Sequence, residues 1–359
     1  MRIFINGTGN VSPQKTWDPG SFLEETKDYY ARMMQCLEPE TDPGLDEKYL
    51  RRMSRMIRLG WLASRICLSD AGNPVPDAII TGSGWGSVMD SEKFLLSIYR
   101  NKESLLPPTP FIQSTHNAVG AQIAMLLNNS AYNVTYAHSS FSFEHAMLDA
   151  IISLKNNDYQ QILLGGVDEV TENQFILSSR QGRWRTGPVN NLELFDNPDK
   201  GTIAGEGFTF FFLSGQKSLN TYAAVKDVMT IFSCAEKVAV TGKINAFLQR
   251  NGLAPGNIDW VVAGLNGDSA GDPFYHEILG KVFSDDCNLA AWKHLTGDYL
   301  TATAFATWAA AKALKNQLMA PALVFNENEK RNGIRNILIY NHFKKIHHSL
   351  ILLTNTDEF

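Results

Sequence analysis

The sequence predicts an α/β protein made of two successive sets of strand and helix units. Short apolar runs, several of which end at glycine, alternate with longer segments whose apolar residues recur at helical spacing. After an aromatic strand at 203–213, the same alternation begins again near 214–220. Because alternating strands and helices build sheets that helices cover, we expect a duplicated α/β architecture rather than a single doubly wound sheet.

The first set runs from the N-terminus to the aromatic strand. Its predicted strands are 2–5, 77–81, the residues from 134, 161–166 and 203–213, and its predicted helices are 21–36, 50–71, 118–127 and the residues from 140. Loops are predicted at the proline-rich segment 106–115 and at 179–200. The glycine-rich turn 82–86 lacks the GxGxxG spacing and the Walker lysine, so it indicates a tight strand-to-helix connection more than a phosphate cradle.

The second set repeats the alternation of strands and helices over fewer residues. Its predicted strands are 222–233, 258–264, 322–325, 336–341 and 349–353, and its predicted helices are 240–251 and 302–314. We therefore place the boundary between an N-terminal half, 1–215, and a C-terminal half, 216–359.

Composition excludes several classes of protein. The 359 residues carry a net charge of −5, which gives no basic excess for neutralising nucleic-acid phosphates. The sequence contains no run of 18 apolar residues, so we expect no transmembrane helix. The N-terminus lacks the apolar core of a signal peptide, and we therefore expect a cytoplasmic protein. The four cysteines are scattered without a CxxC pair, and no nucleotide motif is complete. We expect neither a metal nor a cofactor.

The stretch 134–150 organises the functional prediction. β-forming residues lead through small polar residues into a segment with helical periodicity, so the chain turns sharply from strand to helix. A side chain at such a turn lies at the mouth of a sheet, beside the free N–H groups of a helix N-terminus. His138 is the best-placed candidate for an attacking or proton-transferring group. The alternative is a capped helix start with a half-exposed histidine.

Five short motifs support a more specific prediction. In chain order they are YAHSS (136–140), LGGVD (164–168), GEG (205–207) before the aromatic strand, KHLTGD (293–298) and NHF (341–343). They resemble, in the same order, the TACSS, AGGVDA, GEGAGxLVLE, KSxxGHxxGAAG and NSFGFGG motifs of the β-ketoacyl synthase family of the thiolase superfamily. The resemblance spans nearly the whole chain. It implies a five-layer αβαβα fold built from two similar halves, and normally an obligate dimer.

The resemblance fails at each chemical position. His138 stands where the family has its nucleophilic cysteine, Gly264 where it has the first histidine, and Asp298 where it has the second. Of the motif's polar groups only Lys293 remains, and the glycine-rich turn that supplies an oxyanion N–H has become the segment 343–348, FKKIHH. Condensation needs a thiolate to carry the acyl chain and donors to stabilise an enolate, so we expect no condensation by this chain alone.

Two classes of function follow from the resemblance. The first is a non-condensing partner of an active ketosynthase, similar to a chain-length factor, in fatty acid or polyketide-type biosynthesis. The chain would form a homodimer or a heterodimer through the strand before His138 and the loop 107–117, an acyl carrier protein could bind, and Phe343 and Glu206 would lie at the substrate pocket.

The second class is new chemistry in the old pocket. His138 as general base, Asp298 as orienting group and Lys293 as electrostatic support could serve an acyl-thioester decarboxylase, hydrolase or acyltransferase. The plainer alternative is that Asp298 forms an ion pair with Lys293 in an inactive site.

Overall fold

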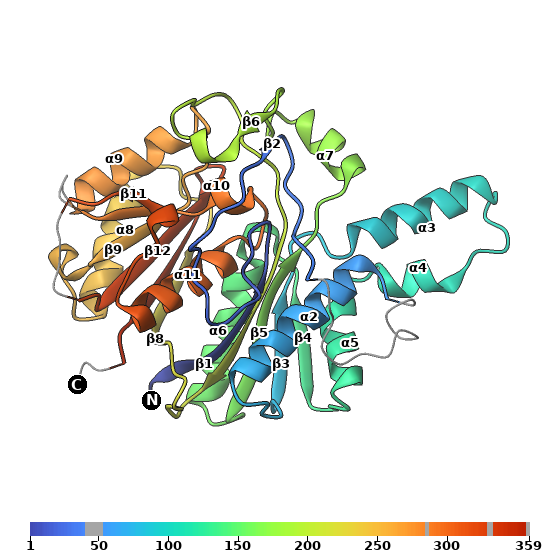
Figure 1. The fold of residues 1–359 in the computed structure, drawn as a ribbon, viewed down its shortest axis with the longest axis horizontal. Coiled ribbons are helices and arrows are strands. Elements are labelled where there is room, and N and C mark those ends of the chain that lie inside the picture. Colours follow the sequence, from blue (N-terminus) through green and yellow to red (C-terminus); the bar gives the residue numbers. More distant parts are fainter. Residues whose placement is uncertain (40–52, 284–286, 329–332, 357–359) are drawn as a thin grey trace.

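Eleven strands form one continuous mixed sheet in the computed structural model, which describes residues 1–39, 53–283, 287–328 and 333–356. Their order across the sheet is β11-β10-β9-β12-β13-β8-β1-β7-β5-β3-β4 (Figure 1). The strands of the first half are β1 (Ile3–Val11), β3 (Ala78–Gly82), β4 (Tyr132–Tyr136), β5 (Gln161–Asp168) and β7 (Gly207–Ser214). Those of the second half are β8 (Ala223–Ile231), β9 (Trp260–Ala263), β10 (Leu289–Ala291), β11 (Val324–Asn326), β12 (Asn336–Phe343) and β13 (His347–Thr354).

The two halves have the same strand order and the same strand directions. In the first, β1 pairs antiparallel with β7 and β7 with β5, and β5, β3 and β4 are then parallel. In the second, β8, β13 and β12 are antiparallel in the same way, and β12, β9 and β10 are parallel. The short antiparallel pairing of β1 with β8 joins the halves. The predicted duplication is therefore confirmed, whereas the boundary between residues 215 and 216 stays a prediction.

Helices form the other layers. The described helices are α2 (Arg55–Asp70), α3 (Val88–Arg100), α4 (Pro108–Gln113), α5 (Ala118–Leu126), α6 (Ser142–Lys155), α7 (Glu172–Ser179), α8 (Lys237–Arg250), α9 (Asp272–Phe283), α10 (Lys293–Thr296) and α11 (Thr303–Asn316). Helices α6 and α11 lie between the halves and contact strands of both. Helices α2 and α5 cover the outer face of the first half, and α8 and α9 that of the second. These are the five layers expected from the family resemblance.

Alternation along the strands divides the core between these layers. In β12, Ile337 and Ile339 pack into the central core around α11, whereas Leu338 and Tyr340 pack against α8 and α9. Successive strand residues point to opposite faces, so a strand covered on both sides is apolar throughout. The sequence of such a strand is a continuous apolar run without alternation. These runs are the pattern from which the buried strands were predicted.

Two predicted elements are wrong. The segment 21–36 is not a helix: Tyr30–Ala31 forms β2, which pairs with β6 (Val189–Asn190), and the Cys36 N–H donates to Glu206. Partners far along the chain satisfy the backbone groups of this segment, and these contacts override the local helical periodicity.

The proline-rich segment 106–115, predicted as a loop, contains α4, which starts at Pro108, where proline's fixed φ suits the first turn of a helix. The first residues of the predicted helix 50–71 lie outside the described residues.

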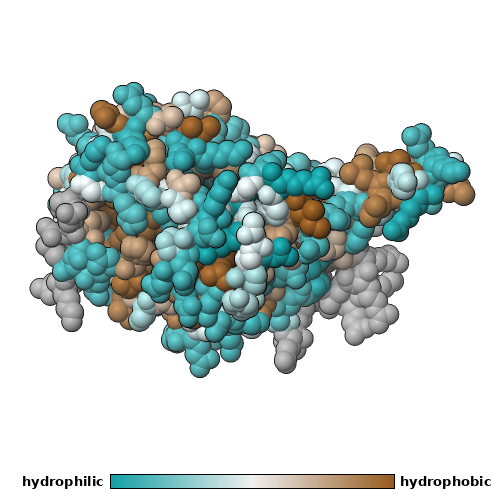
Figure 2. All heavy atoms as spheres, turned by 90° about the horizontal axis from the view of Figure 1, so that it is seen from above, coloured by the Kyte–Doolittle hydropathy of each residue, from teal (hydrophilic) through white to brown (hydrophobic). Residues whose placement is uncertain are grey.

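Helices α3 and α4 form an arm that projects from the body (Figure 1). The Phe94 and Phe111 rings hold the two helices together, with centroids 5.1 Å apart. Only Asp90 is buried in α3. Brown, hydrophobic residues gather on the arm in Figure 2. Within the described ranges, no helix is long and apolar enough to span a bilayer.

Candidate functional site

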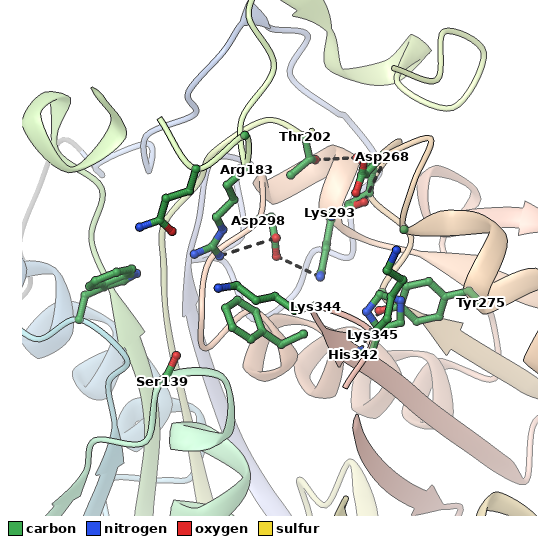
Figure 3. A pocket seen from close by; sticks show the side chains of 17 residues that line it. Ser139, Arg183, Thr202, Asp268, Tyr275, Lys293, Asp298, His342, Lys344 and Lys345 are labelled. Carbon is green, nitrogen blue, oxygen red and sulfur yellow. Dashed lines mark hydrogen bonds and ion pairs between the residues drawn. The ribbon is translucent and has the colours of Figure 1, made fainter. Parts of the chain in front are cut away.

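A cavity of about 400 Å³ opens beyond the ends of strands from both halves (Figure 3). Trp85 and Ser139 line it from the turns after β3 and β4, and Gly264 and His342 line it from the ends of β9 and β12. In α/β sheets, the carboxyl ends of parallel strands are the usual place for ligand sites. Four cationic residues line the cavity, Arg183, Lys293, Lys344 and Lys345, against two acidic residues, Asp268 and Asp298.

Asp298 and Lys293 meet in this cavity as an ion pair. Lys293 Nζ lies 3.0 Å from Asp298 Oδ1, and Arg183 lies 3.7 Å from Oδ2. The Asp298 backbone is fixed on both sides, because its N–H donates to the Ile203 carbonyl and its carbonyl accepts from Gly205 N–H. Burial would raise the pKa of Asp298, but the charges of Lys293 and Arg183 outweigh it and hold the pKa below its ordinary value. Asp298 is therefore ionised at neutral pH.

His138 is exposed and is not among the residues that line the cavity. Its ring stacks on Phe141 with centroids 5.5 Å apart and lies 4.9 Å from the His145 ring. Its backbone N–H donates to Ser142 Oγ at the start of α6. The structure thus brings Lys293 and Asp298 together and leaves His138 apart from them. The turn residue that does line the cavity is Ser139, whose φ of 46° is left-handed.

The space beside Gly264 is already filled. A Cβ on this glycine would collide with the Tyr275 hydroxyl and the Asn341 side-chain oxygen. These two groups are 3.1 Å apart in a buried hydrogen bond, and the Tyr275 hydroxyl also accepts from the His342 N–H. A histidine at position 264 would therefore have to displace a hydrogen-bonded pair.

The turn between β12 and β13 brings lysines to the cavity. Lys344 and Lys345 both have left-handed backbone conformations, with φ of 54° and 61°, and Ile346 N–H donates to the Phe343 carbonyl. This is the geometry of a tight hairpin turn, which asparagine and glycine adopt at least cost. Phe343 lines the cavity, and its role in a substrate pocket stays a prediction.

Glu206 does not line the cavity. It is fully buried, and Arg55 binds its carboxylate through both terminal nitrogens, at 3.0 and 2.7 Å. The backbone N–H groups of Cys36 and Val170 also donate to it. Glu206 therefore links the N-terminal segment, α2 and the segment after β5 to the start of β7.

Asp168, at the end of β5, joins the two halves. One of its carboxylate oxygens accepts from the N–H groups of Gly84 and Trp85, and the other accepts from the N–H and hydroxyl of Thr301. The glycine-rich turn after β3 is therefore a structural connection held by a carboxylate, as its missing phosphate motifs predicted.

Several notable side chains were not singled out from the sequence. Arg183 lies in the segment 179–200, which carries no periodic pattern, and His342 stands where the family motif has serine. Glu144 is completely buried on α6, and burial raises its pKa to about 7 against the opposing effect of the nearby Ser349 and Thr303 hydroxyls. Its sequence signal was a carboxylate on the apolar face of a helix.

No group of three or more His, Cys, Asp or Glu residues in the described ranges has the arrangement of a metal site. Five buried or half-buried histidines have lowered pKa values: His145, His294, His342, His347 and His348. Burial lowers the pKa of His294 to about 4, and burial together with the Lys293 charge lowers that of His342 to about 3. His342 also stacks on Tyr275 with ring centroids 4.0 Å apart. Burial lowers the pKa of His348 as well.

Comparison with known proteins decides the family. The model of the β-ketoacyl synthase N-terminal domain matches residues 5–218. The chain belongs to the β-ketoacyl synthase family. A curated relative, polyketide synthase PksM of Bacillus subtilis (strain 168), is 27% identical over 247 residues. That match covers 62% of this chain and 6% of the relative's length.

Solved structures of this family share the fold over the whole chain. The ishigamide ketosynthase/chain length factor matches with a TM-score of 0.80 and 17% identity, covering 99% of both chains. A β-ketoacyl synthase from Burkholderia phymatum STM815 matches at 0.79 and 15%, again covering 99% of both. A ketosynthase in complex with its chain length factor, from Xenorhabdus doucetiae, matches at 0.74 and 14% and covers 99% and 98%. These matches establish the thiolase-like fold.

Proposed function

We propose that this chain is a non-condensing ketosynthase-like subunit that pairs with an active ketosynthase. The observation that carries the proposal is the ionised Asp298, paired with Lys293 at the position where the family has a neutral histidine donor. A carboxylate there repels a developing enolate instead of stabilising it. Removal of one oxyanion donor costs about a hundredfold to a thousandfold in rate, and here the thiolate is absent as well.

The filled space at Gly264 supports the same proposal. Tyr275 and Asn341 hydrogen-bond to each other where a side chain at position 264 would lie, so the second donor is excluded by packing as well as by sequence. Two of the structural neighbours are ketosynthases together with chain length factors, which gives a precedent for pairing on this fold.

The pairing surface that we propose combines β4 with the arm of α3 and α4. Strand β4 is the last strand of the sheet, so one row of its backbone N–H and C=O groups has no strand partner within the described chain. The arm adds exposed apolar side chains, with Tyr99 84% and Leu105 98% exposed. Exposed apolar surface of this extent is typical of a protein interface. An antiparallel β4 pair across a two-fold axis would extend the sheet through both subunits.

Thioester turnover tests the non-condensing assignment. We expect the purified chain to leave malonyl and acyl thioesters unconsumed, and His138→Ala to change nothing in a ketosynthase with which the chain co-purifies. The alternative, a decarboxylase, hydrolase or acyltransferase that uses His138 as base, requires turnover that His138→Ala abolishes. Such turnover would contradict the proposal. The exposed position of His138 outside the cavity lining favours the first outcome.

A further inference from the structure

Two cations of the cavity converge on one aromatic ring. The Arg183 guanidinium lies 5.5 Å from the centroid of the Phe343 ring, and Lys344 Nζ lies 5.3 Å from the same centroid. In the view of Figure 3, the charged ends of both side chains point into the same part of the cavity beside Asp298. Like charges repel, and Asp298 supplies one negative charge against Arg183, Lys293 and Lys344, so a further anion beside them would reduce the remaining repulsion.

Arg183 is held in place but lacks a close acceptor. Its guanidinium stacks on Trp184 at 4.4 Å as well as on Phe343. Within the described residues, its only ion-pair partner is Asp298, at 3.7 Å, which is beyond hydrogen-bonding distance. Lys293, at 3.0 Å, takes the other Asp298 oxygen. A planar guanidinium fixed by stacking and without a close acceptor is well suited to bind a carboxylate or phosphate through two hydrogen bonds.

The lysine turn carries backbone strain that packing does not explain. Lys344 and Lys345 are exposed, yet both adopt the left-handed conformation that favours glycine or asparagine. A residue with a Cβ adopts this conformation only at an energetic cost. What the lysines add in return is positive charge at the mouth of the cavity, where Lys345 Nζ is fixed by the Ala270 carbonyl. Strain of this kind at a cavity indicates function.

His342 provides an independent indication of a ligand. Both of its ring nitrogens are buried, and neither has a hydrogen bond of ordinary geometry among the described residues, although the Gly271 backbone lies close enough to oppose part of the lowering of the His342 pKa. Its ring lines the cavity, stacked flat on Tyr275. Buried polar atoms in native proteins nearly always have partners, so a polar group of a bound molecule is the natural partner here. A volume of about 400 Å³ accommodates a small organic molecule.

We propose that this cavity binds a small molecule with an anionic head group, a carboxylate or a phosphate, through Arg183 and Lys344, while His342 hydrogen-bonds its uncharged body. The site does not depend on pairing with a ketosynthase. The choice of probes below does rest on the proposed function, because acyl-thioester pathways use both malonyl carboxylates and phosphopantetheine.

Isothermal titration calorimetry on the purified full chain tests the proposal with two matched pairs of probes. Phosphopantetheine and pantetheine differ by a phosphate, and malonate and malonamide differ by two carboxylates. We expect at least one anionic probe to bind at millimolar or lower concentration, its neutral partner to bind at least about tenfold more weakly, and the affinity to fall with added salt. Binding in the first pair alone identifies a phosphate, and in the second alone a carboxylate.

Two variants and a control make the test specific. Arg183→Gln should weaken binding about 10- to 100-fold, since hydrogen bonds to charged groups are among the strongest. Lys344→Asn combined with Lys345→Gly should also weaken binding but raise the melting temperature, because it relieves the turn. Opposite changes in affinity and stability exclude simple unfolding. Lys243→Gln, at an exposed lysine of α8, should leave affinity unchanged.

Three results would overturn the site. The first is that neither anionic probe binds at concentrations up to about 10 mM. The second is that the anionic and neutral probes of a pair bind equally well. The third is that Arg183→Gln leaves the affinity unchanged. None of these results bears on co-purification with a ketosynthase, so failure of the site and failure of the proposed function can be told apart.

Discussion

At the scale of single residues, Asp298 and Lys293 form a buried ion pair that lines the cavity. Both side chains are largely buried, with 14% and 4% of their surfaces exposed. A buried pair contributes little net stability over a well-packed apolar pair, but breaking it leaves an uncompensated charge. The pair is therefore difficult to change one residue at a time.

We expect Asp298→Asn to destabilise the protein by about 3 kcal/mol, because Lys293 stays buried without its closest counter-ion. Lys293→Met in the same chain should restore most of the loss. Urea unfolding of wild type, both single variants and the double variant measures the coupling. Glu277→Gln, which breaks exposed pairs with Lys237 and Lys281, should have a far smaller effect. A stable Asp298→Asn protein would mean that the pair is not the constraint we describe.

At the scale of elements, the arm of α3 and α4 is the part of the fold least explained by the monomer. A helix normally buries an apolar stripe, whereas α3 buries only Asp90. Three of its apolar residues, Leu95, Leu96 and Tyr99, are exposed, and the others are only half-buried. The proline-rich segment was predicted as an interface loop. In the structure it supplies α4, the second helix of the arm, so the interface expected there consists of two helices.

We expect Tyr99→Lys combined with Leu105→Lys to prevent assembly without unfolding the chain. Each side chain would otherwise bury apolar surface worth about 1.5 to 3 kcal/mol, so the dissociation constant should rise by at least about a hundredfold. Light scattering after size exclusion at micromolar concentration measures assembly, and circular dichroism checks the fold. Leu219→Lys is the matched control, because Leu219 is fully exposed on the turn between β7 and β8. A wild-type chain that is monomeric even with a ketosynthase present would contradict the interface.

At the scale of the whole molecule, several buried carboxyl groups make stability depend on pH. Burial raises the pKa of Glu144 to about 7, of Glu169 to about 7 and of Asp272 to about 6. A group whose pKa is higher in the folded than in the unfolded state contributes stability at low pH. That contribution is lost as pH rises through the folded-state value. The fold should therefore weaken between about pH 5 and pH 8, opposite to the effect of Asp298, whose lowered pKa makes its contribution fade in acid.

We expect Glu144→Gln to flatten this dependence. Glu144 lies in the central layer between the halves. Its pKa rises from 4.5 to about 7 on folding, so ionising it should lower the free energy of unfolding by up to about 3 kcal/mol, at about 1.4 kcal/mol per pKa unit. Relative to wild type, the variant should gain stability from about pH 5 to about pH 7 in denaturant titrations, and the difference should level off above about pH 8, where the carboxyl is ionised in both states. The exposed Glu25→Gln should show no such trend. Parallel curves for Glu144→Gln and wild type would contradict the assignment.

The fold class, the duplication and the family could all be predicted from sequence patterns. Glycine at strand ends, continuous apolar strands such as β5 and the order of five short motifs are local signals, and the backbone follows them because covered strands must be apolar on both faces. The same motifs placed Lys293 and Asp298 in one site, and the structure shows them 3.0 Å apart.

Which side chains line the cavity together could not be predicted from the sequence. Arg183 enters from a segment without periodicity and is fixed by stacking between Trp184 and Phe343, which is 160 positions away in the chain from Arg183. His138 does not line the cavity, although its position in the motif predicted that it would. The segment 21–36 is not helical, because its backbone groups pair with residues near 190 and 206. Such outcomes depend on contacts between distant residues, whose free energies local sequence patterns do not contain.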